Sequence, residues 1–217
     1  MHKETLLQRF TTMSIYNCAV QPRRSKILWM KITNLIQLSI SEISLIAATL
    51  QKRGPCHTLI FGLGNDSLFW HLLNQDGHTV FLENNLIWYE KVISKHPQVQ
   101  AHVVQYNTYR SQWQTLLANP ATLNLALPVE VTAKRWDVIL VDAPNGWRDN
   151  QPGRMKSIYM ASKLIRPGGD VFVHDCNRKV EQVYASTFLG DIHLTASIGR
   201  LRHFHMSDEA PSALTRI

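Results

Sequence analysis

The sequence predicts an α/β protein whose doubly wound, mostly parallel seven-stranded sheet ends in a C-terminal antiparallel hairpin. Three observations support this fold class. Short apolar segments alternate with helical segments through most of the chain, as in parallel sheets. The apolar segment Thr58–Phe61 is followed by a turn with two glycines, the arrangement that opens a nucleotide-binding fold. Near the end, the segments 192–198 and 200–206 flank Gly199, which is typical of a hairpin.

Length and composition indicate one globular domain. The chain has 217 residues, of which 45% are hydrophobic and 18% are charged, as in ordinary globular proteins. We expect the domain to span residues 39–206, after an N-terminal extension (1–38) and before a C-terminal tail (207–217). The extension is basic, since no acid occurs between Glu4 and Glu42, so a transit peptide is an alternative to a loose extension.

Charge and cysteine usage exclude several classes of protein. The net charge of +7 comes from scattered basic residues, which indicates a basic surface or an acidic substrate and no specific nucleic-acid partner. Three widely spaced cysteines form neither a disulfide framework nor a metal motif. No run of 18 apolar residues occurs, so no membrane span is expected. These features predict a soluble, intracellular, cytoplasmic protein, with organelle import or Golgi association as alternatives. The oligomeric state is not predicted.

The domain is expected to begin with a helix over residues 40–52, because Ser39 and Glu42 form a capping box and Gly54-Pro55 ends the helical pattern. The other predicted helices are one after the glycine turn and those at residues 86–95, 110–119, 155–165 and 180–189. The predicted strands before the hairpin are 58–61, 79–82, 99–104, 136–141 and 170–175, with a loop around 125–128.

A glycine turn and an acid at the end of the second strand predict a nucleotide-cofactor site. Gly62 and Gly64 allow close backbone approach, and a residue in 65–67 is expected to cap the next helix. Glu83 lies 19 residues beyond Gly64, the spacing at which an acid binds a ribose hydroxyl. Ser67 stands where the third glycine of the dinucleotide motif would be. The predicted cofactor contacts are Gly62, Gly64, Asp66, Ser67 and Glu83.

The order of elements favours one cofactor over another. Five alternating units followed by a terminal hairpin are typical of a class I S-adenosylmethionine methyltransferase. A dehydrogenase usually adds a substrate domain or a sixth parallel strand, for which a chain of 217 residues has little room. Because Glu83 would hold a ribose of either cofactor, a nicotinamide-dependent oxidoreductase stays an alternative.

Six blocks of sequence follow one another in a characteristic order. They are Leu59-Ile-Phe-Gly-Leu-Gly-Asn-Asp-Ser-Leu-Phe-Trp70, Thr79-Val-Phe-Leu-Glu83, Trp136-Asp-Val-Ile-Leu-Val-Asp-Ala-Pro-Asn-Gly146, Pro152-Gly-Arg-Met-Lys-Ser-Ile-Tyr159, Asp170-Val-Phe-Val-His-Asp-Cys-Asn-Arg178 and Gly199-Arg-Leu-Arg-His-Phe204. Together they resemble the glucuronoxylan 4-O-methyltransferase family, which belongs with the irregular-xylem proteins to a polysaccharide-biosynthesis domain group. The resemblance runs from about Ser39 to Phe204.

The resemblance implies S-adenosylmethionine as the donor and a sugar hydroxyl as the acceptor. In known family members the acceptor is the 4-hydroxyl of glucuronic acid on xylan, so the implied partner is an acidic glycan. Plant members typically carry an N-terminal membrane anchor, which is not expected here because residues 1–38 contain no long apolar run, and a longer region between strands three and four. Some members have no clear activity, so a non-catalytic accessory protein in xylan biosynthesis is the main alternative.

Residues at the carboxyl ends of the later strands are the candidates for chemistry. Asp142 is predicted to act as general base, to orient the acceptor or to bind a cation. His174 and Asp175 are the next catalytic candidates, since histidine transfers protons near neutral pH. Asp142, Asp175 and Asn177 also resemble the oxygen set that holds magnesium in catechol-type O-methyltransferases, so a divalent cation is a further possible cofactor.

Acceptor binding is assigned to basic and aromatic residues. Arg154 is predicted to bind a uronate carboxylate in a bidentate fork, with Arg202 and other arginines assisting. Trp147 and Tyr159 are predicted to stack on a sugar ring, although such aromatics also occur in cores. Each of these residues could instead have a purely structural role, such as a surface ion pair.

Overall fold

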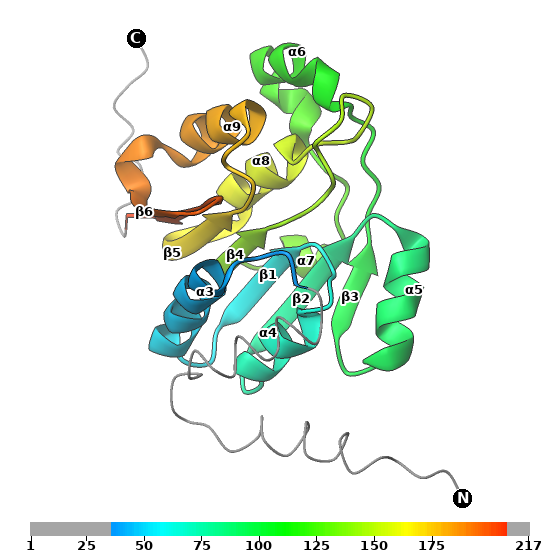
Figure 1. Cartoon of the computed structure of the whole chain (residues 1–217), viewed down its shortest axis with the longest axis vertical. Coiled ribbons are helices and arrows are strands. Elements are labelled where there is room, and N and C mark those ends of the chain that lie inside the picture. Colours follow the sequence, from blue (N-terminus) through cyan, green and yellow to red (C-terminus); the bar gives the residue numbers. More distant parts are fainter. Residues whose placement is uncertain (1–35, 208–217) are drawn as a thin grey trace, which may run out of the picture.

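The computed structural model describes residues 36–207, which Figure 1 draws in colour. The strands are β1 (His57–Phe61), β2 (His78–Glu83), β3 (Gln100–Val103), β4 (Trp136–Val141), β5 (Ile165–Val173), β6 (Leu194–Ile198) and β7 (Leu201–His205). The α-helices are α3 (Ile40–Arg53), α4 (Ser67–Leu73), α5 (Leu86–Lys95), α6 (Trp113–Ala118), α7 (Val129–Thr132), α8 (Met155–Leu164) and α9 (Lys179–Leu189). Short 3-10 helices cover Arg110–Gln112, Pro120–Leu123 and Asp191–His193. Most of the predicted extension and of the predicted tail lies outside the described residues.

The sheet confirms the predicted fold class. Its seven strands run in the order β3-β2-β1-β4-β5-β7-β6. The first five strands pair in parallel, and β7 pairs antiparallel with both β5 and β6. The strand order reverses between β1 and β4, and ligands of open α/β sheets bind at such a switch point, beyond the carboxyl ends of the strands.

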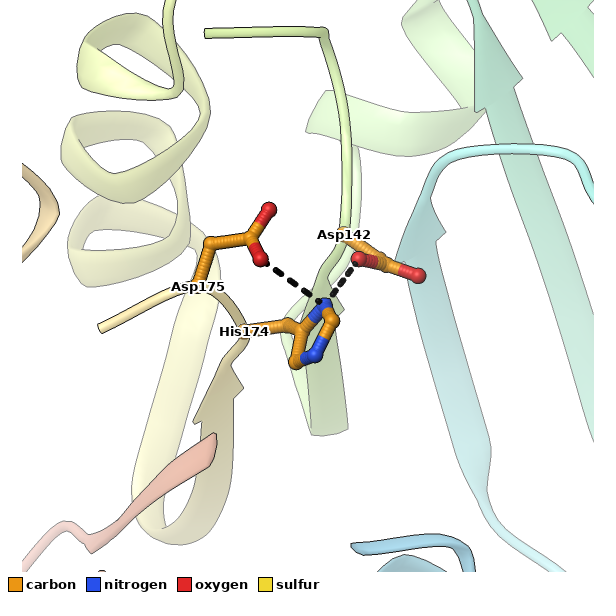
Figure 2. A group of neighbouring side chains, drawn as sticks. All are labelled: Asp142, His174 and Asp175. Carbon is orange, nitrogen blue, oxygen red and sulfur yellow. Dashed lines mark hydrogen bonds and ion pairs between the residues drawn. The ribbon is translucent and has the colours of Figure 1, made fainter. Parts of the chain in front are cut away.

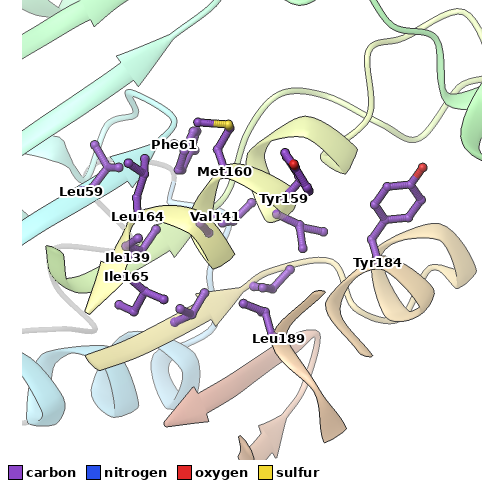
Figure 3. Packing of buried hydrophobic residues seen from close by; sticks show 14 of the residues in the cluster. Leu59, Phe61, Ile139, Val141, Tyr159, Met160, Leu164, Ile165, Tyr184 and Leu189 are labelled. Carbon is purple, nitrogen blue, oxygen red and sulfur yellow. The ribbon is translucent and has the colours of Figure 1, made fainter. Parts of the chain in front are cut away.

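Alternate residues of each strand contribute to two hydrophobic layers. Leu59 and Phe61 of β1 face α8 and α9, while Ile60 between them faces α3, α4 and α5. Figure 3 shows part of the first layer, in which Met160 and Tyr184 belong to the cluster that covers β1, β4 and β5. Because both faces are covered, the central strands carry continuous apolar runs, such as residues 59–61 of β1 and 138–141 of β4. Among residues 36–207, no helix is long and apolar enough to cross a membrane.

Several elements differ from the predicted bounds. The segment predicted as one helix over 110–119 divides into a 3-10 turn and the short helix α6, and α7 follows the predicted loop. Strand β5 begins at Ile165, five residues before the predicted start at Asp170, because Ile165 pairs with Trp136. Gly168 and Gly169 then pair with the end of the hairpin through hydrogen bonds to and from Met206.

Asp170 joins three elements at the end of the sheet opposite the switch point. Its carboxylate binds the guanidinium of Arg53, the last residue of α3. It also lies 2.7 Å from Nε2 of His203 and 2.9 Å from Nδ1 of His205, both on β7. Burial by itself raises the pKa of Asp170, but the hydrogen bonds from the two histidines and Arg53 outweigh it and lower the pKa from 3.8 to about 2.

We expect Asp170 to make the stability of the fold depend on pH. Because its folded pKa lies below the unfolded value, its contribution is present above about pH 4 and is lost as the pH falls toward 2. Asp170→Asn should therefore lower the free energy of unfolding by about 2 kcal/mol at pH 7. Urea unfolding of both proteins should show this difference at pH 7 and a smaller one at pH 3. An equal difference at both pH values would contradict the assignment.

Candidate active site

A cleft of about 690 Å³ opens at the carboxyl ends of the parallel strands. Its size suits a small-molecule ligand, for which pockets measure about 300–1,000 Å³. Nine of the predicted site residues line it: Gly62, Gly64, Asp66, Ser67, Glu83, Asp142, Trp147, Arg154 and Asp175. The topology thus brings together residues that lie up to 113 positions apart in the sequence, between Gly62 and Asp175.

The turn after β1 forms one wall of the cleft. Gly62 has φ 124°, a conformation that residues with a side chain rarely adopt, and a Cβ atom there would lie 3.2 Å from that of Ala143. The amide of Gly64 donates to the hydroxyl of Ser67 (2.8 Å), the first residue of α4. The backbone is therefore held open toward the cleft at the predicted cofactor position.

Asp66 has a different role from the predicted helix cap. It occupies the N-cap position of α4 but makes no capping hydrogen bond there, and Oδ2 accepts instead from the indole Nε1 of Trp70 (2.8 Å). Burial, with a further contribution from the neighbouring Asp142 carboxylate, raises the pKa of Asp66 to about 6. The cleft therefore contains two carboxylates near each other, an arrangement that favours a positively charged ligand group.

Glu83 and the start of α5 line the cleft next to this turn. Oε1 of Glu83 accepts from the amides of Asn84 and Asn85 (both 2.8 Å), and Oε2 accepts from the amide of Leu63 (3.1 Å). Since a carboxylate offers about four acceptor positions, Oε2 retains one for a ligand hydroxyl. The indole of Trp88, in the first turn of α5, donates to the carbonyl of Leu63 and so lies across the glycine turn.

Asp142 presents its carboxylate to the cleft directly after β4. Its side chain is 26% exposed, and Oδ1 lies 2.8 Å from Nδ1 of His174 and 3.0 Å from Nη2 of Arg154. Burial by itself raises the pKa of Asp142, but the guanidinium and the hydrogen bond from His174 outweigh it and hold the pKa below its ordinary value. Asp142 is therefore ionised at neutral pH and accepts the hydrogen bond from His174.

Figure 2 shows that His174 and Asp175 approach Asp142 from the end of β5. His174 is fully buried and lies behind Asp142, so its ring does not line the cleft. The predicted direct contact between His174 and a substrate is therefore replaced by a contact with Asp142. Asp175 does line the cleft, with φ 61°.

Arg154 has partners other than the predicted uronate. It is 4% exposed, and its Nη2 donates to the carbonyl of Asp142 (2.6 Å) and contacts the carboxylates of Asp142 (3.0 Å) and Asp175 (2.8 Å). A guanidinium held between two carboxylates is not free to form a bidentate fork with an acceptor. Arg154 instead compensates the charge of two buried acids.

The donor set fits a divalent cation poorly. Asp142, His174 and Asp175 offer ligand atoms within 4.8 Å of one another, and Asn177, predicted as the third ligand, is exposed and is not part of this group. Arg154 and Arg178 both contact Oδ2 of Asp175 at 2.8 Å, and Arg200 contacts Oδ1 at 3.0 Å. A cation would have to displace these guanidinium groups.

Two further predicted acceptor residues lie away from the cleft. Tyr159 is 9% exposed and packs edge-on against Phe188, with 5.2 Å between ring centroids, so it belongs to the hydrophobic core. Arg202 lies on β7 opposite Val173 and does not line the cleft. Tyr159 corresponds to the core alternative that the sequence left open.

Trp147 is the predicted aromatic that the structure leaves available. It lines the cleft, is 58% exposed, and has the guanidinium of Arg148 over its ring at 4.4 Å from the centroid. The side-chain oxygen of Gln151 accepts from the amides of both residues (3.0 Å each), which fixes their loop.

The sequence did not identify several residues that line the cleft. Arg178 follows Asp175 by three positions and forms an ion pair with it. This spacing, just before a helix, is the one sequence feature that could have predicted the pair. Asn85 and Trp88 follow Glu83 by two and five positions, where a side chain can contact a base. Ile36 and Leu38 also line the cleft, although the predicted domain began at Ser39.

Known proteins with related sequences match most of this chain. Glucuronoxylan 4-O-methyltransferase 2 of Arabidopsis thaliana is 39% identical over 197 residues, which cover 81% of this chain and 68% of the relative. Arabinogalactan O-methyltransferase 2 of the same plant is 39% identical over 199 residues (80% and 68%). Protein IRREGULAR XYLEM 15 of A. thaliana is 34% identical over 193 residues (77% and 60%).

The fold resembles that of a solved methyltransferase structure, and the sequence matches a family model. The precorrin-6y C5,15-methyltransferase of Geobacter metallireducens superposes with a TM-score of 0.52 at 12% identity, over 80% of this chain and 91% of that protein, which supports the Rossmann-like methyltransferase fold. The model of the family described as IRX15/IRX15L/GXM matches residues 41–126 and 119–204. The chain therefore belongs to the IRX15/IRX15L/GXM family.

Proposed function

We propose that this protein is an S-adenosylmethionine-dependent O-methyltransferase that methylates a hydroxyl of a uronic-acid-containing glycan. The observation that carries the proposal is the position of Asp142, an ionised carboxylate in the same cleft as the glycine turn and Glu83. The names of the glucuronoxylan and arabinogalactan relatives support both the reaction and the class of acceptor.

The turn after β1 and the end of β2 would bind the donor. Glu83 would accept hydrogen bonds from ribose hydroxyls through Oε2, and Trp88 would contact the adenine ring. Asp66 would favour the positive charge of the donor over a neutral analogue. When bound, S-adenosylmethionine supplies an electrophilic methyl group on a sulfonium.

Asp142 would orient the acceptor hydroxyl and receive its proton. Arg154 and His174 stabilise the carboxylate and so make it a weak base, which suits a proton transfer that is late in the displacement. Their contacts also fix the direction of Oδ1, so the second oxygen can align the hydroxyl with the methyl group. Asp142 is therefore expected both to position the acceptor hydroxyl and to take part in the proton transfer.

Trp147 and Arg148 would form the acceptor platform in place of Arg154 and Tyr159. An exposed indole on a fixed loop can stack on a sugar ring, and the adjacent guanidinium can pair with a uronate. Arg178 supplies a second positive charge on the cleft wall. This arrangement favours an acidic sugar over a neutral one.

A divalent cation has no part in these steps, because the Asp142, His174 and Asp175 group is already neutralised by arginines. The second candidate function is a non-catalytic accessory role in glycan synthesis. It rests on the similarity to Protein IRREGULAR XYLEM 15, whose name states no activity. An accessory protein would bind the donor without turnover, or would not bind it.

Donor binding is the first test of the proposal. Calorimetric titration should show binding of S-adenosylmethionine, and Glu83→Ala should weaken it by about tenfold, because about 1.5 kcal/mol is typical of a hydrogen bond to a charged group. NAD serves as the comparator, and Glu90→Ala on the exposed side of α5 serves as the matched control. Binding of NAD in preference to the methyl donor would overturn the proposal in favour of an oxidoreductase.

A further inference from the structure

Glu42 is a buried acid that the proposed chemistry does not use. It lies in the first turn of α3 and is 2% exposed. Its Oε2 accepts from the amide of Ser39 (2.6 Å), which completes the predicted capping box. Its Oε1 accepts from the amide of Arg200 (2.7 Å), 158 residues further along the chain. The residue that caps the helix therefore also contacts the hairpin.

His174 lies between Glu42 and the candidate active site. Its Nδ1 faces Asp142 at 2.8 Å, and its Nε2 lies 3.8 Å from Oε1 of Glu42. Within residues 36–207, this buried Nε2 makes no hydrogen bond. Glu42 is thus placed to satisfy it, since hydrogen bonds in unliganded active sites are often long and shorten in the complex.

The charges around Glu42 favour the same pairing. Of the described basic side chains, only that of His174 lies within ion-pair distance of Glu42. Asp142 and Asp175, the other acids that face His174, already pair with Arg154, and Asp175 also pairs with Arg178 and Arg200. The two backbone amides already donate to Glu42, and a nearby cationic side chain would stabilise its buried charge further; His174 is the one within reach.

The hairpin turn leaves space for this contact. Gly199 has φ 58°, and a Cβ atom at this position would lie 2.8 Å from Oε1 of Glu42. A glycine therefore allows the turn to approach the carboxylate while the next amide, that of Arg200, donates to it. Three segments that are distant in sequence, namely α3, the end of β5 and the hairpin turn, meet at one carboxylate.

We propose that Glu42 is a positioning residue for methyl transfer: with both ring nitrogens of His174 protonated, Nε2 donates to Glu42 while Nδ1 donates to Asp142 and keeps its carboxylate aligned with the acceptor hydroxyl. The inference rests on the proposed function, because the alignment matters only if Asp142 contacts the acceptor. A residue that acts in this way affects the reaction step and does not affect ground-state binding.

The kinetic test compares Glu42→Gln with Ser39→Ala. Glutamine keeps the size of the side chain and removes the charge that faces His174, and we expect kcat to fall by about tenfold. The KM values for donor and acceptor, and the donor Kd from calorimetry, should stay within about twofold. Ser39→Ala removes the hydroxyl from the same helix cap and should lower Tm without changing kcat. An unchanged kcat in Glu42→Gln, or an equal fall in Ser39→Ala, would overturn the proposal.

A second measurement does not depend on turnover. In protein labelled with ¹⁵N-histidine, the ring signals of His174 are identified by their loss in His174→Asn. We expect these signals to shift in Glu42→Gln and to stay in place in Ser39→Ala. If the ring signals are unchanged in Glu42→Gln, the proposed contact between Glu42 and His174 is wrong. If the native protein binds the donor but does not turn over, the proposed function fails, while this measurement still decides whether Glu42 holds His174.

Discussion

Asp142→Asn is expected to lower kcat by a factor on the order of 10² to 10⁴, the range typical of losing a general acid or base. Asparagine keeps the size of the side chain and one oxygen for Arg154, but it cannot receive the acceptor proton. The effect should appear in kcat, because the carboxylate contributes most when the hydroxyl proton is leaving. Steady-state kinetics of the two proteins at saturating donor and acceptor would measure it.

Donor binding separates this chemical effect from a damaged cleft. The contacts of Glu83 and of the glycine turn do not involve Asp142, so Asp142→Asn should bind S-adenosylmethionine with nearly native affinity. A variant that retains native kcat would remove Asp142 from the reacting centre. A variant that no longer binds the donor would assign Asp142 to the donor site instead.

Arg154→Ala is expected to lower the free energy of unfolding by about 3–5 kcal/mol, as is typical when one partner of a buried ion pair is removed. The guanidinium is 4% exposed and contacts the carboxylates of Asp142 and Asp175, which would both lose a partner. Arg148→Ala is the matched control, because Arg148 is exposed and should cost no more than about 0.5 kcal/mol.

Denaturant unfolding at pH 7 measures the free energy of unfolding of both arginine variants. The large loss should be confined to Arg154→Ala, and the loss of acceptor affinity should be confined to Arg148→Ala. If Arg154→Ala kept native stability and weakened only acceptor binding, the uronate fork predicted from the sequence would be correct, and the buried bridge between Asp142 and Asp175 would not.

The sequence was sufficient to predict the fold and the position of the cleft, because both follow from local patterns. Alternating apolar strands and helices specify a parallel sheet, and carboxyl ends of neighbouring strands meet at one edge. Gly62, Glu83, Asp142 and Asp175 therefore line one cleft, as predicted. Helix α5 has the predicted bounds, Leu86–Lys95, since Asn85 caps its start and Pro97 follows its end.

The direction of long side chains could not be predicted in the same way. Arg154 precedes α8, and only the packed structure decides whether its guanidinium turns toward solvent or between two aspartates. Tyr159 lies on the same helix, on a face that packs against α9. The capping box accounts for an acid at position 42, so no local sequence pattern predicted the hydrogen bond that Glu42 accepts from the amide of Arg200. That contact joins residues 158 positions apart.

Methyl transfer to an acidic sugar can be observed directly by following a labelled methyl group. Native protein would be incubated with S-adenosylmethionine carrying a ¹³C-methyl group and a glucuronate-bearing oligosaccharide, with the carboxyl-reduced oligosaccharide as control. We predict a ¹³C-methyl ether on a hydroxyl of the glucuronate and little transfer to the reduced sugar. Arg148→Ala should lose this preference for the glucuronate over the reduced sugar. Donor binding without any labelled sugar would contradict methyl transfer to a glycan, and equal transfer to both oligosaccharides would contradict the preference for an acidic sugar.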